Sequence, residues 1–176
     1  MSAEPVDLER LVRAIEDFPK PGISFKDITP LLADPHGLAA AVAGLAEPFR
    51  AAGITKVVGM EARGFIFAAP VAVALGAGFV PVRKGGKLPG AVNRQEYELE
   101  YGTDLLEVHQ DAIGGHDRVL IIDDVLATGG TAAATQRLLA QSGAMVEAFG
   151  FVIELAFLGG RAALGDTAVT SLITYA

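Results

Sequence analysis

Hydrophobic and polar positions along the first third of the chain follow helical spacing. The apolar positions of residues 8–15 recur at i, i+3, i+4 and i+7 and predict a helix, which the prolines of residues 19–21 end. Asp34-Pro35 predicts the start of a second helix, because Asp caps a helix N-terminus and Pro fits its first position. The buried face of that helix continues up to Gly53.

From residue 56 onward, strand-like and helix-like segments alternate. The predicted strands are 56–60, 78–82, 119–122 and 146–155, with Ile173 marking a last one, and the predicted helices are 64–75 and 131–142. This alternation predicts an α/β fold with a doubly wound, mainly parallel sheet flanked by helices and right-handed crossovers. The run 119–122 is apolar throughout, as is typical of a central strand covered on both faces. Sheets of this kind bind ligands at the carboxyl ends of their strands.

Two segments are predicted to be neither helix nor buried strand, and the second of them interrupts the alternation. Residues 18–32 are rich in Pro and Gly but contain Ile23, Phe25 and Ile28, which predicts an ordered loop that packs those side chains. Residues 84–102 hold four glycines, a proline and many charged side chains, too polar for a core segment. They predict either a solvated hairpin or a mobile lid over an active site.

Composition limits the class of protein. The 176 residues suit one domain spanning residues 1–176, and with 51% hydrophobic and 20% charged residues a core can form. The net charge of −7 argues against a protein that binds duplex nucleic acid, but a local cleft can still attract a small phosphorylated substrate. The chain has no cysteine, which excludes disulfides, thiolate nucleophiles and Cys-based metal centres.

Neither secretion nor a membrane is indicated by the sequence. The first ten residues carry three acidic side chains and no apolar core, and no apolar stretch reaches 18 residues. A cytoplasmic protein is therefore expected. His36, His109 and His116 show no metal-ligand spacing, so surface or packing roles are the default for them.

One motif carries the candidate chemistry: residues 119–131, VLIIDDVLATGGT. Asp123 and Asp124 come where the predicted strand ends, and a small Gly/Thr-rich turn then leads into a helix. The turn consists of Ala127, Thr128, Gly129, Gly130 and Thr131. Free backbone N–H groups and the positive end of the helix dipole favour an anion there, and glycines let the backbone approach it.

Two carboxylates beside a bound phosphate need another partner. A ligand with both a phosphate and a vicinal diol, together with a divalent cation, satisfies all of these groups, and a ribose 5-phosphate has that form. The alternative is an N-cap region that is acidic without binding anything. Neither G-x-x-x-x-G-K-[ST] nor G-x-G-x-x-G follows a strand, so the sequence does not support P-loop or dinucleotide-binding folds.

The 119–131 run resembles the phosphoribosyl pyrophosphate (PRPP) signature of type I phosphoribosyltransferases, and DDVLATGGT is similar to its form in the adenine phosphoribosyltransferase family. Three further segments agree with that family, in the same order: FPKPGISFKDITPLL at 18–32, EARGF at 61–65, and RKGGKLPG followed by YELEYG at 83–102. The resemblance runs from Phe18 to Leu155. It implies the type I phosphoribosyltransferase fold, with a small N-terminal hood at 18–32 that binds the base and a flexible lid hairpin at 84–102.

The activity that the resemblance implies is purine salvage, in which adenine and PRPP give AMP and pyrophosphate. Mg²⁺ would bind mainly through the substrate, with Asp123 or Asp124 in contact through water. The expected partners are these small molecules and a second copy in a homodimer, with no nucleic acid and no membrane. Alternatives are a transferase for hypoxanthine/guanine, xanthine or orotate, and a non-catalytic PRPP sensor. The sensor would need a DNA-binding segment, for which length and charge leave no room.

The resemblance also assigns roles to residues. Loop 127–131 would hold the 5′-phosphate, and Asp123 and Asp124 would hold the ribose hydroxyls and stabilise positive charge on the sugar. Pyrophosphate would contact the loop that follows the first apolar strand, which the family builds with a non-proline cis peptide near Glu61-Ala62. The pyrophosphate candidates are Glu61, Ala62, Arg63, Lys84 and Lys87, with Arg83 at the root of the lid.

For the base, the resemblance selects Ser24, Phe25 and Lys26, with Phe25 stacking on the purine and backbone groups reading its edge. Packing of Phe25 in the core is the alternative. Glu100 would accept the N9 proton of adenine, and the resemblance selects it among the alternating glutamates of 96–100. Tyr101 would close the lid against the ribose.

Overall fold

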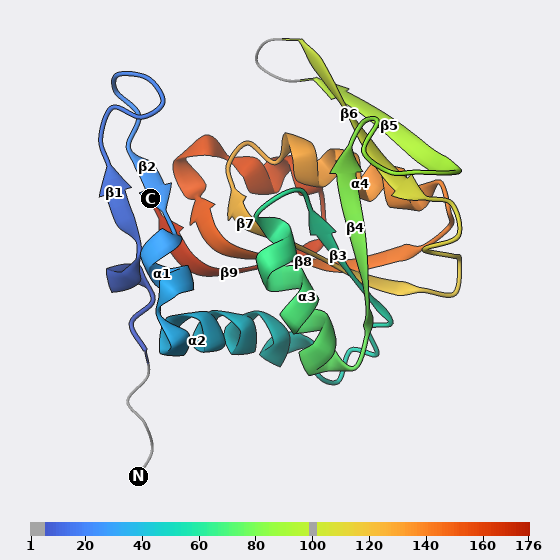
Figure 1. The fold of residues 1–176 in the computed structure, drawn as a ribbon, viewed down its shortest axis with the longest axis horizontal. Coiled ribbons are helices and arrows are strands. Elements are labelled where there is room, and N and C mark those ends of the chain that lie inside the picture. The colour runs from blue at the N-terminus through green and yellow to red at the C-terminus, as the bar shows by residue number, and fades with distance from the viewer. Residues whose placement is uncertain (1–5, 99–101) are drawn as a thin grey trace.

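Seven strands form a central sheet in the order β5-β6-β4-β3-β7-β8-β9, as Figure 1 shows for a computed structural model that describes residues 6–98 and 102–176. The strands are β3 Lys56–Met60, β4 Gly78–Lys84, β5 Val92–Glu98, β6 Thr103–His109, β7 Arg118–Leu126, β8 Met145–Leu155 and β9 Ala168–Tyr175. The neighbouring pairs β4–β3, β3–β7, β7–β8 and β8–β9 are parallel. At the other edge, β6 pairs antiparallel with both β4 and β5. The predicted doubly wound, mainly parallel sheet is confirmed.

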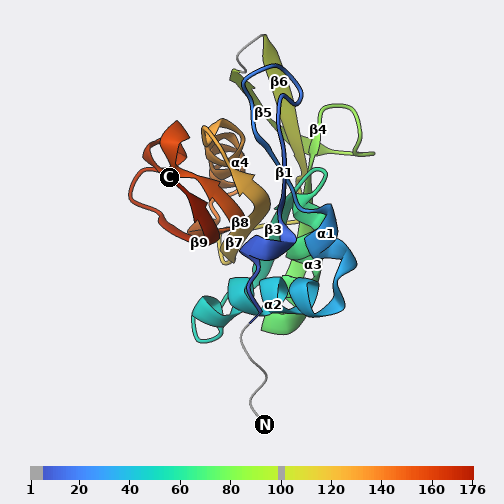
Figure 2. The same cartoon turned by 90° about the vertical axis from the view of Figure 1, so that its left-hand side faces the viewer.

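Helices cover both faces of the sheet. α1 Thr29–Ala33, α2 Pro35–Ala46 and α3 Gly64–Leu75 lie on one face, and α4 Gly130–Ala140 lies on the other (Figure 2). Successive residues of β7 point to opposite faces, so Leu120 and Ile122 pack with α2 and α3, whereas Val119 and Ile121 pack on the side of α4. The short 3-10 helices are η1 Glu9–Leu11, η2 Glu47–Phe49, η3 Ala156–Leu158 and η4 Gly160–Leu164.

Several boundaries agree with the sequence prediction. β3 and α3 begin and end at the predicted residues, β8 and β9 lie where expected, and α4 is shifted by one or two residues. Asp34 caps α2 as predicted, because its carboxylate accepts a hydrogen bond of 2.7 Å from the N–H of Gly37. The buried face of this helix continues beyond its end at Ala46 into η2, where Phe49 is buried.

The helix predicted for residues 8–15 is wrong. That segment forms η1 and then β1 Arg13–Ile15, which pairs antiparallel with β2 Phe25–Asp27 in a separate two-stranded sheet. The guanidinium of Arg13 lies 2.5 Å from the carboxylate of Asp27 and ties the two strands together. Pairing with a distant strand and this ion pair therefore outweigh the local helical spacing.

The segment 18–32 also differs from the predicted loop. It contains β2 and the start of α1, although Ile28 is buried as expected. Ile23 is 43% exposed, so the prediction that it packs in the interior is wrong. The polar segment 84–102 does enter a hairpin, since β5 lies within it and pairs along its whole length with β6. Within residues 6–98 and 102–176, no helix is both long and apolar enough to cross a membrane.

Candidate functional site

The winding of the sheet reverses between β3 and β7. The chain leaves β3 through α3 to β4 on one side, and it leaves β7 through α4 to β8 on the other. Because β3 and β7 pair directly, the loops that follow them, 61–63 and 127–129, meet at the same edge of the sheet. A reversal of this kind opens a crevice for a ligand at the carboxyl ends of the strands.

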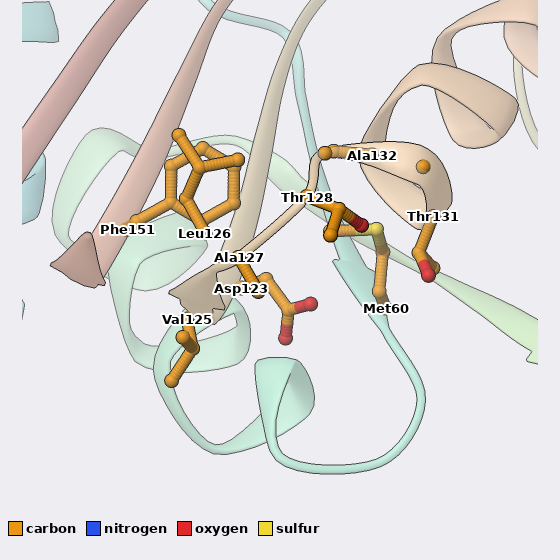
Figure 3. A pocket seen from close by; sticks show the side chains of 11 residues that line it. Met60, Asp123, Val125, Leu126, Ala127, Thr128, Thr131, Ala132 and Phe151 are labelled. Atoms are coloured by element: carbon orange, nitrogen blue, oxygen red, sulfur yellow. The ribbon is translucent and has the colours of Figure 1, made fainter. Parts of the chain in front are cut away.

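The loop after β7 has the form predicted for an anion site. Gly129 caps α4 in the left-handed conformation, with φ 81° and ψ −2°, and no side chain caps the first turn of this helix. The first N–H groups of the helix are therefore free to bind a ligand. A hollow of about 90 Å³ lies against loop 127–131, and Figure 3 shows Thr128, Thr131 and Asp123 around it.

Asp123 and Asp124 both line the crevice. They lie within β7 and not after its end, so the prediction that the strand ends at these aspartates is wrong. β7 runs on to Leu126 because β8 is long enough to continue the pairing to that residue. The Oδ2 of the buried Asp124 lies 2.5 Å from the Nε of Arg63, which comes from the loop after β3. This ion pair joins the loop after β3 to the last part of β7.

Asp123 differs electrostatically from its neighbour. Burial first, and then the charge of Asp124, raise the pKa of Asp123 well above its usual range. α3 begins directly against this carboxylate, because a Cβ at Gly64 would lie 2.8 Å from the Oδ1 of Asp123 and 3.0 Å from the carbonyl oxygen of Ile122. Only glycine fits between the helix and the strand at that point.

The loop after β3 places one carboxylate between two cationic side chains. The peptide bond Glu61–Ala62 is cis, as the resemblance implied. Glu61 accepts hydrogen bonds from the N–H of Lys84 at 2.9 Å, from Arg83 at 3.3 Å and from the ammonium of Lys87. Burial opposes the ionised form, but these hydrogen bonds outweigh it and lower the pKa of Glu61. In this structure Glu61 therefore pairs with the side chains of Arg83 and Lys87 and with the backbone of Lys84, all of which were candidates for the pyrophosphate site.

The two-stranded sheet brings the predicted base-binding residues to the cleft. Phe25 packs edge-on against Phe18, with ring centroids 5.3 Å apart, while the guanidinium of Arg63 lies 5.7 Å from the centre of its ring. The ammonium of Lys26 lies 4.5 Å from the centre of the Tyr175 ring, so the last strand supports this segment. Phe25 is half-buried and lines the cleft, so it combines packing with a surface open to a ligand.

A cleft of about 720 Å³ unites most of the predicted residues, and a base, a sugar and a diphosphate fit a space of this size. Its lining includes all or part of each predicted group: Ser24, Phe25, Lys26, Glu61, Ala62, Arg63, Lys84, Asp123, Asp124, Ala127 and Thr131. Thr128, Gly129 and Gly130 line the adjoining 90 Å³ hollow. Lys87 is linked to the cleft through Glu61. Glu100 and Tyr101 lie outside the described residues.

Sequence reasoning missed Tyr97 as a residue of the cleft. It is buried, and its hydroxyl donates a hydrogen bond of 3.3 Å to Asp104, whose carboxylate also lies 3.1 Å from the ammonium of Lys84. Desolvation raises the pKa of Tyr97, so the phenol stays protonated. The available signal was alternation: Tyr97 is an aromatic residue between Glu96 and Glu98 on a strand, and it therefore faces the opposite side.

Asp27 fixes the two-stranded sheet, and its replacement by asparagine should weaken that sheet in a pH-dependent way. Hydrogen bonds from the hydroxyl and N–H of Thr29, followed by Arg13, lower its pKa from 3.8 to about 2. Because the folded pKa is the lower one, the stabilisation is present above pH 3.8 and is lost as the pH falls towards about 2. Thermal melts followed by circular dichroism should therefore show a lower melting temperature for Asp27→Asn at pH 7, and a difference from wild type that shrinks in acid.

Asp34→Asn is the matched control for that experiment, because asparagine caps a helix as well as aspartate does. Its melting temperature should stay close to wild type at both pH values. A difference between Asp27→Asn and wild type that stays constant down to pH 2 would contradict the role given to the ionised Asp27.

Comparison with known proteins connects this geometry to one family. The family model described as "Phosphoribosyl transferase domain" matches residues 31–162. The chain is similar to adenine phosphoribosyltransferase of Acaryochloris marina, with 58% identity over 170 residues that cover 97% of this chain and 100% of the relative.

Solved structures agree with the sequence comparison. The crystal structure of adenine phosphoribosyltransferase from Thermoanaerobacter pseudethanolicus superposes with a TM-score of 0.92 at 48% identity, covering 96% of this chain and 98% of that one. The enzyme from Saccharomyces cerevisiae, solved with adenine and an imino-altritol bisphosphate, has a TM-score of 0.89 at 42% identity, covering 94% and 96%. The similarity therefore extends over nearly the whole chain.

Proposed function

The chain belongs to the phosphoribosyl transferase domain family, and from this premise we propose that it transfers the phosphoribosyl group of PRPP to adenine, giving AMP and pyrophosphate in purine salvage. In this reaction the bond between adenine N9 and C1′ forms, the bond between C1′ and the pyrophosphate oxygen breaks, and the N9 proton leaves. The observation that carries the proposal is the 720 Å³ cleft, in which the hood, the loop after β3 and the Asp pair converge beside loop 127–131.

Loop 127–131 is proposed to bind the 5′-phosphate through the free N–H groups at the start of α4 and the hydroxyls of Thr128 and Thr131. Asp123 and Asp124 lie near the end of β7, shortly before this loop, and their carboxylates are proposed to accept hydrogen bonds from the 2′ and 3′ hydroxyls. A ribose fixed at three points in this way presents C1′ to the base. Fixed orientation lowers the barrier for the displacement.

Pyrophosphate is proposed to lie between the loop after β3 and the root of the hairpin. Arg63, Lys84 and Lys87 supply positive charge there, and the backbone at Ala62 borders the same cleft. Glu61 would serve as an anchor for Lys87, and for the backbone of Lys84, and not as a direct ligand of an anion, because like charges repel.

Mg²⁺ is proposed to bind through the substrate. Among the described residues, no group of three or more His, Cys, Asp or Glu is placed to hold a metal ion, so the hydroxyls and diphosphate must supply most of the ligands. Asp123 fits a contact through water better than Asp124, whose carboxylate is paired with Arg63. When bound, the ion neutralises charge on the leaving diphosphate.

Adenine is proposed to lie against Phe25, with the backbone around Ser24 and Lys26 reading its edge. Glu100 is proposed to accept the N9 proton, and Tyr101 to close the lid over the ribose. These last two roles rest on the resemblance of YELEYG to the family motif. The cytoplasm is the proposed location.

A panel of bases tests the proposed activity. Purified protein with PRPP and Mg²⁺ should form AMP from adenine and no nucleotide from guanine, hypoxanthine, xanthine or orotate. If the protein used another base instead, the proposal of phosphoribosyl transfer would stand and only the proposed base would be wrong. Binding of PRPP with no product from any base would replace the enzyme by a sensor.

A homodimer is proposed through the outer face of α3. Ile66 is 40% exposed and Val73 82% exposed on this helix, and Phe79 of β4 is 36% exposed nearby. Apolar side chains gathered on adjoining elements are typical of an interface. Light scattering should then give twice the chain mass of 18.2 kDa.

Replacing Lys87 by methionine should raise the KM for PRPP by about tenfold, with kcat and the KM for adenine little changed, because one charge–phosphate contact is lost. Steady-state kinetics with each substrate varied in turn measure this. Lys56→Met, at the far end of β3, is the matched control and should leave both KM values unchanged. An unchanged KM for PRPP in Lys87→Met would remove Lys87 from the pyrophosphate site.

A further inference from the structure

An ion pair with a buried carboxylate and a half-exposed arginine lies behind the phosphate loop, and neither of its residues lines the 720 Å³ cleft or the 90 Å³ hollow. The Nε and Nη2 of Arg161 donate hydrogen bonds of 2.6 and 2.7 Å to the two carboxylate oxygens of Glu154. The hydroxyl of Ser171 adds a third hydrogen bond of 2.7 Å to the same carboxylate, and Arg161 Nη1 donates to the carbonyl of Val169 at 3.1 Å. The pair thus joins η4 to the ends of β8 and to β9.

Two glycines press η4 against the phosphate loop. A Cβ at Gly129 would overlap the carbonyl oxygen of Gly160 and lie 3.0 Å from the Cβ of Ala163. In the opposite direction, a Cβ at Gly160 would overlap the carbonyl oxygen of Ala127. The backbones therefore touch at both ends of the tightest part of the loop, and a shift of η4 must shift the loop with it.

The position of Glu154 strengthens this connection. In the register of β7 and β8, Glu154 lies opposite Leu126, the residue directly before the phosphate loop. Its side chain is only 6% exposed, so its charge depends on Arg161 and Ser171 for compensation. A bidentate Arg–carboxylate contact also fixes direction as well as distance.

We infer that Glu154 and Arg161 form a positioning pair that sets loop 127–131 for the phosphorylated end of the substrate. The inference rests on the proposed function, since it assigns this loop to the 5′-phosphate. The N–H groups at the start of α4 bind phosphate only at hydrogen-bond distance, so a small displacement of η4 weakens every contact at once. The hood lies on a separate sheet, and its base contacts should be indifferent to the pair.

Arg161→Met should raise the KM for PRPP and the Kd for ribose 5-phosphate by about 10- to 100-fold, the scale expected when a binding group moves by a fraction of an ångström. The KM for adenine should stay within about twofold of wild type, because the variant weakens the contacts to the phosphate and leaves the proposed contacts to the base unchanged. Arg161→Lys keeps the charge but loses the forked contact, so it should give a smaller rise. Ser171→Ala removes one hydrogen bond and is the mildest variant.

Arg118→Met is the matched control. Its Nε lies 3.2 Å from Glu147, and this ion pair joins β7 to β8 at the opposite ends of the same strands. Loss of that pair should lower the melting temperature without changing the KM for PRPP. This control separates positioning of the loop from general stability of the sheet.

Calorimetry with ribose 5-phosphate and steady-state kinetics, both well below the melting temperatures, decide the inference. It is overturned if folded Arg161→Met keeps the wild-type values for PRPP and ribose 5-phosphate, or changes them no more than Arg118→Met does. If Arg161→Met does not fold, Arg161→Lys and Ser171→Ala are judged by the same criterion. Wild-type protein that makes no AMP would refute the proposed function, while the ribose 5-phosphate measurement would still test the pair.

Discussion

Asp124→Asn should lower kcat/KM for AMP formation by about 100-fold while the protein stays folded. The substitution keeps the shape of the side chain but removes its negative charge. That charge pairs with Arg63 across the crevice and strengthens the hydrogen bonds that the carboxylate is proposed to accept from the ribose hydroxyls. Loss of one preorganised electrostatic contact in a catalytic cleft has an effect of about this size. Folding should be preserved because the Arg63 side chain is 50% exposed and can be hydrated. Kinetics and melting curves on the same preparation measure both effects.

Asp123→Asn is the matched control for that substitution, and the structure predicts a smaller loss for it. Burial and the neighbouring charge raise the pKa of Asp123, and asparagine resembles the protonated acid. More of the wild-type side chain ionises as the pH rises, so the deficit of Asp123→Asn should grow at high pH and narrow at low pH. Equal losses for the two variants at every pH would show that the two aspartates act alike and would contradict the predicted difference between them.

Gly129→Ala should abolish measurable binding of ribose 5-phosphate and lower kcat/KM for PRPP by at least about 100-fold. A Cβ at this position overlaps the carbonyl oxygen of Gly160, so the loop must open to admit it. The left-handed conformation adds a cost of about 1–2 kcal/mol for alanine, which should lower the melting temperature as well. Calorimetry with ribose 5-phosphate measures the binding, and a thermal melt measures the stability.

Gly76→Ala separates the two effects. Gly76 has the same left-handed conformation at the end of α3, and nothing lies within 4 Å of its added Cβ. This variant should be destabilised by the left-handed conformation but bind ribose 5-phosphate as wild type does. The role given to Gly129 fails if its alanine variant binds ribose 5-phosphate as well as Gly76→Ala does.

The sequence predicted the parallel sheet because each βα unit carries its own signal. The apolar run of β7, the glycines of the loop and the Ala-rich α3 are local patterns, and local patterns suffice when strands are buried on both faces. The motif 119–131 also predicted its place at the edge of the sheet, since the carboxyl ends of parallel strands gather there.

What the sequence did not predict depends on contacts between distant residues. The helical spacing of residues 8–15 gave no sign that Arg13 would pair with Asp27 and that a strand would form. The extension of β7 past the aspartates follows from the length of β8, and the clustering of cations around Glu61 follows from the meeting of β4 with the loop after β3. None of these contacts leaves a periodic trace in the chain.

Two of the proposed base-binding residues, Phe25 and Lys26, lie on a ribbon, β1–β2, that shares no strand pairing with the main sheet among the described residues. Side chains such as Lys26 on Tyr175, and Arg63 on Phe25, join it to the rest. Substitutions in this ribbon can therefore change its surface without changing the strand pairing of the main sheet. On the proposed function, substitutions confined to residues 13–27 would change which base fits and leave the proposed sugar- and phosphate-binding residues unaltered, so a lineage could acquire a new selectivity without passing through an inactive ancestor.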